Sequence, residues 1–169
     1  MTRTPFRFLL AAALLGSGVP ATAANIVRLK SPPPALILQG VRVPAGSDML
    51  YLSGQLASTI DPAKASAPPA SLTMADYGDT KTQTVSTLNK IKGILAVQGY
   101  AMSDIIKMTV FVAGDPKLSG KMDFAGMNDG FKMFFGTADN PNTVARSTVQ
   151  VAALAGPNYL VEIEVTAAK

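Results

Sequence analysis

Residues 144–166 read VARSTVQVAALAGPNYLVEIEVT, and this stretch decides the fold class. Apolar and acidic side chains alternate in residues 159–166, which predicts a strand with one apolar and one acidic face. The apolar face holds Val161, Ile163 and Val165. Residues 144–152 also alternate, and a turn at residues 155–158 separates the two segments. The stretch therefore predicts two neighbouring strands of one sheet.

Three further strands are predicted upstream. The β-branched run at residues 105–112 predicts a strand that is buried on both faces. Residues 36–43 and 49–55 flank a turn-forming segment at residues 45–48, so they predict a β-hairpin. A loose arm, interrupted by prolines, is expected to lead into this hairpin.

Two helices are predicted between the strands. The first runs from an N-cap at Asp79 to Gln98 and stops at Gly99, because apolar residues recur there at helical spacing. The second is predicted over residues 122–135 for the same reason.

The predicted order β-β-α-β-α-β-β defines an α+β domain over residues 24–169. Two helices cover one face of a mixed sheet in such a two-layer fold. Residues 58–77 contain three prolines and show no periodicity, so they predict a long surface loop.

The composition excludes several kinds of catalysis. The 169 residues include no His, no Cys and no Trp. A Ser-His-Asp triad, an imidazole base, a thiolate nucleophile, a disulfide framework and zinc sites built from His or Cys are therefore excluded. Any catalysis has to use carboxylates, Arg, Lys, Tyr, hydroxyls or backbone groups.

Residues 1–23 have the zones of a secretory signal peptide in export order. Arg3 and Arg7 precede an apolar run at residues 8–15, and small residues at 21–23 supply a cleavage site. The run is too short to cross a bilayer, which needs about 20 apolar residues. We therefore expect an exported protein, periplasmic in a Gram-negative source. Cleavage would leave 13 basic and 11 acidic side chains and lower the charge from +4 to +2, too little to predict binding to nucleic acid or to an anionic membrane.

Motifs spread from about residue 35 to the C-terminus resemble the Rid family, also called RidA-like or YjgF proteins. They are LYLSGQ at 50–55, GD at 78–79 with Gln83, IKMTVFV at 106–112, MN at 127–128 with FF at 134–135, ARSTVQVA at 145–152 and VEIE at 161–164. The resemblance implies a chorismate-mutase-like α+β fold and a homotrimer with sites in clefts between subunits. It also implies hydrolysis of reactive 2-imino or 2-enamino acids to 2-oxo acids and ammonia. No metal and no organic cofactor is implied.

Two side chains carry the implied chemistry. Arg146 occupies the position of an arginine that holds the substrate carboxylate, and a guanidinium suits this task because its planar fork binds a carboxylate in a bidentate manner. Glu162 matches a glutamate that places or activates the attacking water. Arg146 could instead form a structural ion pair with Glu162 or Glu164, and Glu162 could be a solvated residue of the sheet. Strand register cannot be read from the sequence, so both alternatives stay open.

Five more residues match the site of the family. Ser53 and Gly54 match a strand that lines the site, where a glycine lets a ligand approach the backbone. Asn128 matches a helix asparagine near the site, and a capping role fits it equally well. Thr148 is expected in the wall of the site. Ile37 stands where many relatives have a tyrosine, so a hydroxyl and an aromatic face are missing there.

Two other functions stay open on the sequence. The chain could be a non-catalytic trimer that uses Arg146 to hold small carboxylates. A nuclease or RNA-binding function, a label that family members have sometimes carried, ranks last because no His is available for RNA cleavage and no basic run has interleaved aromatic residues. The expected partners are further copies of this chain and small 2-imino or 2-oxo acids, with no nucleic acid and no stable membrane association.

Overall fold

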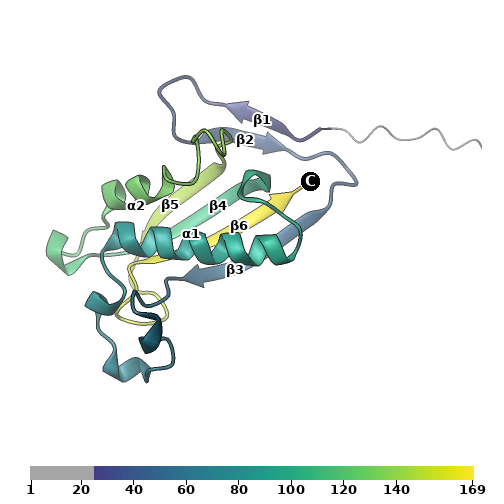
Figure 1. Ribbon diagram of the computed structural model, residues 1–169. Coiled ribbons are helices and arrows are strands. Elements are labelled where there is room, and N and C mark those ends of the chain that lie inside the picture. The colour runs from purple at the N-terminus through teal and green to yellow at the C-terminus, as the bar shows by residue number, and fades with distance from the viewer. Residues whose placement is uncertain (1–24) are drawn as a thin grey trace, which may run out of the picture.

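The computed structural model describes residues 25–169, in which two helices cover one face of a four-stranded mixed sheet (Figure 1). The strands are β1 (Val27–Lys30), β2 (Leu38–Arg42), β3 (Met49–Leu56), β4 (Ile105–Ala113), β5 (Ala145–Val151) and β6 (Val161–Ala168). The helices are α1 (Thr80–Val97) and α2 (Phe124–Phe131). The predicted α+β class is confirmed. The predicted signal peptide, residues 1–23, lies outside the described residues.

The main sheet has the order β3-β6-β4-β5, so β4 separates β5 from β6. β4 runs parallel to β5 and antiparallel to β6, and Met108 stands opposite Arg146 on one side and opposite Val165 on the other. The prediction that residues 144–152 and 159–166 form neighbouring strands is therefore wrong. The physical reason is that β4 is the most apolar strand of the sheet. Its place between β5 and β6 gives it a hydrogen-bonded neighbour on each edge.

The N-terminal strands form a separate two-stranded sheet, seen above the main sheet in Figure 1. β1 pairs with β2, which reaches the main sheet through a hydrogen bond from Leu38 N to Val144 O at 3.0 Å. β3 pairs with β6 instead, next to two mutual backbone bonds between Asp48 and Lys169. The hairpin predicted between β2 and β3 is therefore wrong, and the predicted loose arm contains β1. A turn at Gly46, whose φ of 84° suits glycine, carries the chain from one sheet to the other.

The first helix begins and ends where the sequence predicts. Asp79 caps α1 by accepting a hydrogen bond from Thr82 N at 2.8 Å, and Gly99, with a φ of 75°, follows its end. α2 is shorter than the predicted residues 122–135, because the chain tightens into turns after its eight residues. Two glycines within α2 also weaken its helical preference. No helix within residues 25–169 is long and apolar enough to cross a membrane.

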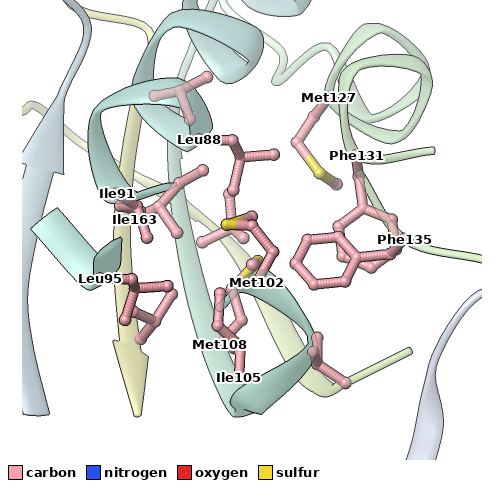
Figure 2. Close-up of a cluster of buried hydrophobic side chains, with 14 of the residues drawn as sticks. Leu88, Ile91, Leu95, Met102, Ile105, Met108, Met127, Phe131, Phe135 and Ile163 are labelled. Atoms are coloured by element: carbon pink, nitrogen blue, oxygen red, sulfur yellow. The ribbon is translucent and has the colours of Figure 1, made fainter. Parts of the chain in front are cut away.

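One apolar core lies between the helices and the sheet (Figure 2). Fully buried members include Leu88, Ile91 and Leu95 of α1, Met127 and Phe131 of α2, and Met108 and Ile163 of the sheet. Each such side chain stabilises the fold by roughly 1.5–3 kcal/mol through removal of apolar surface from water. This core fixes α2 against β4 and β5, which is the arrangement that positions the candidate site.

The other face of the main sheet is open. Lys107 on β4 is exposed, and Tyr51 on β3 is 71% exposed. The prediction that residues 105–112 are buried on both faces is therefore wrong for the single chain, because no described segment covers this face.

The loop at residues 58–77 contains three short 3-10 turns and lies against the β5–β6 connection (Figure 1). Lys64 pairs with Asp76 at 2.5 Å within it, and Asn158 Nδ2 donates to Leu72 O at 2.8 Å. The ion pair therefore closes the loop on itself, and the bond from Asn158 ties the loop to the β5–β6 connection.

Candidate active site

Arg146 is held on the helix-covered face of the sheet by three residues of α2. Its Nη2 donates a hydrogen bond to Asn128 Oδ1 at 2.6 Å, and its Nη1 lies 3.7 Å from Met127 Sδ. Its Cζ lies 4.4 Å from the centroid of the Phe131 ring, within reach of a cation–π interaction. Helical spacing places these three side chains on one side of α2. The chain by itself therefore fixes the orientation of the guanidinium.

The Arg146 guanidinium has no carboxylate partner in the part of the chain that the structure describes. The ion pairs there join Lys64 to Asp76 and Lys132 to Asp129. Arg146 Nε is buried and makes no hydrogen bond to the described residues. Burial lowers the pKa of Arg146 to about 10, so the side chain stays protonated at neutral pH. A partly buried charge without a counter-charge is costly, and an anion bound there would offset that cost.

The next two positions on this face of β5 are also polar. Thr148 Oγ1 is buried and, like Arg146 Nε, has no hydrogen-bond partner among the described residues. Gln150 accepts a hydrogen bond from Met122 N at 3.0 Å and donates one to Gly120 O at 2.8 Å. Gln150 therefore anchors the segment that leads into α2, while Thr148 and Arg146 keep unused polar atoms.

Glu162 lies on the opposite, open face of the sheet. It stands opposite Phe111 on β4 and Leu56 on β3, one position out of phase with the buried Ile163. A β-bulge interrupts the pairing of β3 at Gly54, and a Cβ on this glycine would overlap with the Glu162 carboxylate. The carboxylate therefore occupies space that only a glycine at position 54 leaves free.

The structure divides the sequence-predicted site residues into two groups. The group on the helix-covered face is Arg146, Asn128 and Thr148. The group on the open face is Ser53, Gly54 and Glu162. The sheet itself lies between the groups, so neither Glu162 nor Glu164 pairs with Arg146 within the described part of one chain. Among residues 25–169, no three His, Cys, Asp or Glu side chains lie close enough to hold a metal ion.

Ile37 directly precedes β2 of the N-terminal sheet, beside the start of β5. It lines a cavity of about 410 Å³ together with Arg28 and Thr143. Arg28 clamps this sheet to the domain, because its guanidinium donates to Ser103 O at 2.6 Å, Thr143 O at 2.9 Å and Ile105 O at 3.1 Å. The segment that carries Ile37 is therefore fixed close to the strand that carries Arg146.

The sequence did not reveal that Met127 and Phe131 hold the guanidinium. Both are fully buried and have helical spacing, which is typical of ordinary core residues. The signal that could have found them is their position one residue before and three residues after Asn128, since side chains so placed on a helix surround the same neighbour.

The fold and the site together define a two-layer α+β protein with a fixed arginine that has no carboxylate partner within residues 25–169. The family model described as Endoribonuclease L-PSP matches residues 38–169. The chain therefore belongs to this family, the Rid or YjgF family.

Three relatives show how close the similarity is. A RutC family protein of Haemophilus influenzae is 31% identical over 121 residues, which cover 72% of this chain and 80% of that protein. A RutC family protein of Pyrococcus horikoshii is 39% identical over 92 residues, and the match spans 54% of this chain and only 64% of that protein. TdcF of E. coli, solved with bound serine, is 32% identical with a TM-score of 0.54 and coverage of 84% of this chain and 93% of that chain.

Proposed function

We propose that the chain hydrolyses reactive 2-imino and 2-enamino acids to 2-oxo acids and ammonia. The observation that carries the proposal is the Arg146 guanidinium, held by Asn128 and Phe131 and without a carboxylate partner in the described residues. A 2-imino acid has its carboxylate next to the electrophilic C2, so a fixed guanidinium places that carbon as well. The serine bound to E. coli TdcF, an amino acid with a similar arrangement, supports this substrate class.

The reaction needs one water molecule and one carboxylate base. Water adds to C2 of the protonated imine while the carboxylate accepts one proton of the water, and a carbinolamine forms. The carboxylate then returns this proton to the nitrogen. The C2–N bond breaks with its electron pair leaving on ammonia, and the remaining hydroxyl passes its proton to that ammonia, so that a 2-oxo acid and an ammonium ion are released. We assign the base to Glu162, because a carboxylate can place the water, accept its proton and return it.

The proposed site combines two copies of the chain. Within one chain the sheet keeps Glu162 away from Arg146, so the glutamate that serves an arginine belongs to a neighbouring subunit. The open face has exposed apolar side chains that another copy could cover, since Tyr51 is 71% and Val149 43% exposed. We therefore propose a homotrimer with three sites between subunits, the assembly that the family resemblance implies.

The test uses 2-iminopropionate made in situ by an amino-acid oxidase. We expect the protein to accelerate decay of the imine, Arg146→Ala to abolish the acceleration, and Glu162→Ala to lower it by about 10²–10⁴-fold. Arg42→Ala, a change at an exposed arginine of β2, serves as the matched control. A decay rate equal to that of buffer, with 2-oxo acids still bound, would identify the non-catalytic carboxylate binder instead.

We also propose that the protein is exported, on the strength of the signal-peptide pattern in residues 1–23. An exported deaminase needs a local source of imines, such as a secreted amino-acid oxidase. N-terminal sequencing of the protein from the periplasmic fraction of a Gram-negative host is expected to begin at Ala24. Recovery of chains that start at Met1, in the cytoplasm alone, would contradict export.

A further inference from the structure

A cavity of about 370 Å³ lies beside the C-terminal turn of α1 and shares no residue with either group of site residues. Its apolar wall includes Ala96, Met102, Met133 and Phe134. We call this cavity the α1 groove. Its volume is in the range of pockets that bind small molecules. Met133 is 58% exposed, so solvent and solutes reach it.

Two buried polar atoms of residues that line the α1 groove, Tyr100 Oη and Asn140 Oδ1, have no hydrogen-bond partner among residues 25–169. Asn140 is only 7% exposed, and its Nδ2 donates a hydrogen bond to Phe134 O at 2.8 Å. This bond fixes which end of the amide is nitrogen, so the end without a partner among the described residues is the acceptor Oδ1. A buried acceptor without a donor is costly, which favours a ligand that brings an N–H group.

The charges around the α1 groove favour a cation near Asn140 and an anion farther along α1. Asp139 is exposed at the groove and forms no ion pair among the described residues. The last turn of α1 has no basic residue of its own, and Lys169 Nζ, which donates to Gly99 O at 3.1 Å, offsets the partial negative charge of the helix C-terminus. Lys92 also lines the groove, one helical turn before Ala96, and can receive a carboxylate.

We propose that the α1 groove binds a free α-amino acid with an apolar side chain. The ammonium group donates to Asn140 Oδ1 beside Asp139, and the carboxylate faces Lys92. The apolar side chain packs against Met133 and Phe134. This site is separate from Arg146 and does not depend on the proposed hydrolysis.

The first experiment is calorimetric titration of the Arg146→Ala protein, which removes carboxylate binding at the other site. The probes are L-leucine, 3-methylbutylamine and 4-methylpentanoate, which share an apolar tail and differ in their charged groups. We expect the amine to bind within about fivefold of leucine, because Lys92 is exposed and an exposed ion pair adds little. The acid should bind at least tenfold more weakly than leucine. No saturable binding of leucine, or an acid that binds as well as the amine, would overturn the proposal.

Two pairs of variants locate the binding. Ala96→Phe fills the groove and should weaken leucine binding more than tenfold, while Val97→Phe, at the neighbouring 82% exposed position outside the groove, should change it less than twofold. Lys92→Ala should weaken leucine and leave the amine unchanged, and Lys81→Ala is its control. In methyl NMR spectra, leucine should shift the Met133 signal. Equal effects of Ala96→Phe and Val97→Phe, or an unshifted Met133 signal, would refute the assignment.

Discussion

The carboxylate of Glu162 is placed by the absence of a side chain at Gly54. A Cβ at position 54 would meet only the end of this flexible side chain, so the glutamate can swing away at little cost to the fold. Position 54 thus controls where the carboxylate stands without contributing much to packing.

Gly54→Ala is therefore expected to lower activity and leave stability nearly unchanged. The displaced Glu162 carboxylate would no longer hold the attacking water, so kcat for 2-iminopropionate should fall at least tenfold. The change in the free energy of unfolding should stay within roughly 1 kcal/mol. Gly40→Ala, where a new Cβ would make an ordinary 3.6 Å contact with Leu29, is the control. An unchanged kcat in Gly54→Ala would contradict the proposed role of Glu162 in holding the water.

A counter-charge placed beside Arg146 should stabilise the fold and lower the activity. Asn128→Asp would place a carboxylate 2.6 Å from Nη2 and supply the counter-charge that the described chain lacks. We expect an unfolding temperature at or above that of the parent, because the charge is then paired. The value of kcat/KM should fall about 100-fold or more, because substrate must compete with the new carboxylate. Calorimetry and the oxidase-coupled assay measure the two effects.

A matched Asn128→Ala variant separates the effect of the added negative charge from the effect of losing the asparagine side chain. It removes the hydrogen bond and adds no anion, so we expect a raised KM and a loss of about 1.5–3 kcal/mol of stability, the usual contribution of a hydrogen bond to a charged group. An Asn128→Asp variant that retained the parent kcat/KM would contradict the proposal that the unpaired charge of Arg146 binds the substrate.

The identity of these side chains could be predicted from the sequence, but their neighbours could not. Arg146 and Glu162 stand in recognisable motifs, whereas the contact between Arg146 and Phe131 depends on how α2 packs against β5. That packing is a tertiary property, and the sequence pattern of α2 predicts only that one side of it is apolar.

Among the secondary-structure elements, α2 lies close against α1 at Gly130. A Cβ there would lie 2.8 Å from Thr84 Cβ and 3.2 Å from Lys81 O. The glycine therefore allows α2 to lie close against α1.

Gly130→Ala should push the two helices apart and destabilise the fold by about 1–3 kcal/mol, the usual cost of overpacking. Urea unfolding measures this. Gly93→Ala is a matched control in α1, since nothing lies within 4 Å of its added Cβ, and it should stabilise the fold by roughly 0.5–1 kcal/mol. Equal stability of both variants would contradict the close helix contact.

The stability that the loop at residues 58–77 gives to the fold should depend on pH through the carboxyl group of Asp76. Hydrogen bonds from Lys64 and Thr73 lower the pKa of this carboxyl from 3.8 to about 2. A depressed carboxyl pKa contributes stability that is present above pH 3.8 and is lost as the pH falls through about 2. The unfolding temperature of Asp76→Asn should therefore lie below that of the parent at pH 6, and the difference should close toward pH 2. An equal difference at both pH values would contradict this assignment.

The elements with strong local signals could be predicted, and those that depend on distant partners could not. α1 has a capping aspartate, a terminal glycine and helical spacing, and it begins and ends as predicted. The prediction of a hairpin between β2 and β3 was wrong, because turn-forming residues do not show whether the strands on either side pair with each other. β3 finds its partner in β6, more than 100 residues later, through contacts that no local pattern encodes.

At the level of the assembly, we propose that Arg146 of one chain and Glu162 of another form each site. The strand register puts them on opposite faces, because Arg146 stands beside Met108 and Glu162 beside Phe111 on β4, an odd number of residues apart. The sequence could not show this, since register cannot be read from it. The open face should then be buried between subunits. If the protein forms the proposed trimer, Val149→Glu, which puts a charge on this face, is expected to give monomers in light scattering and to abolish activity, because unpaired buried charges are costly.

The most direct test mixes two inactive variants, Arg146→Ala and Glu162→Ala, by refolding them together in equal amounts. If each site takes its arginine and its glutamate from different chains, random assembly gives about a quarter of the sites both residues, and deaminase activity should return to about a quarter of the parent value. The separately refolded variants should stay inactive. Absence of any recovery in mixtures that demonstrably contain both chains would contradict the shared site.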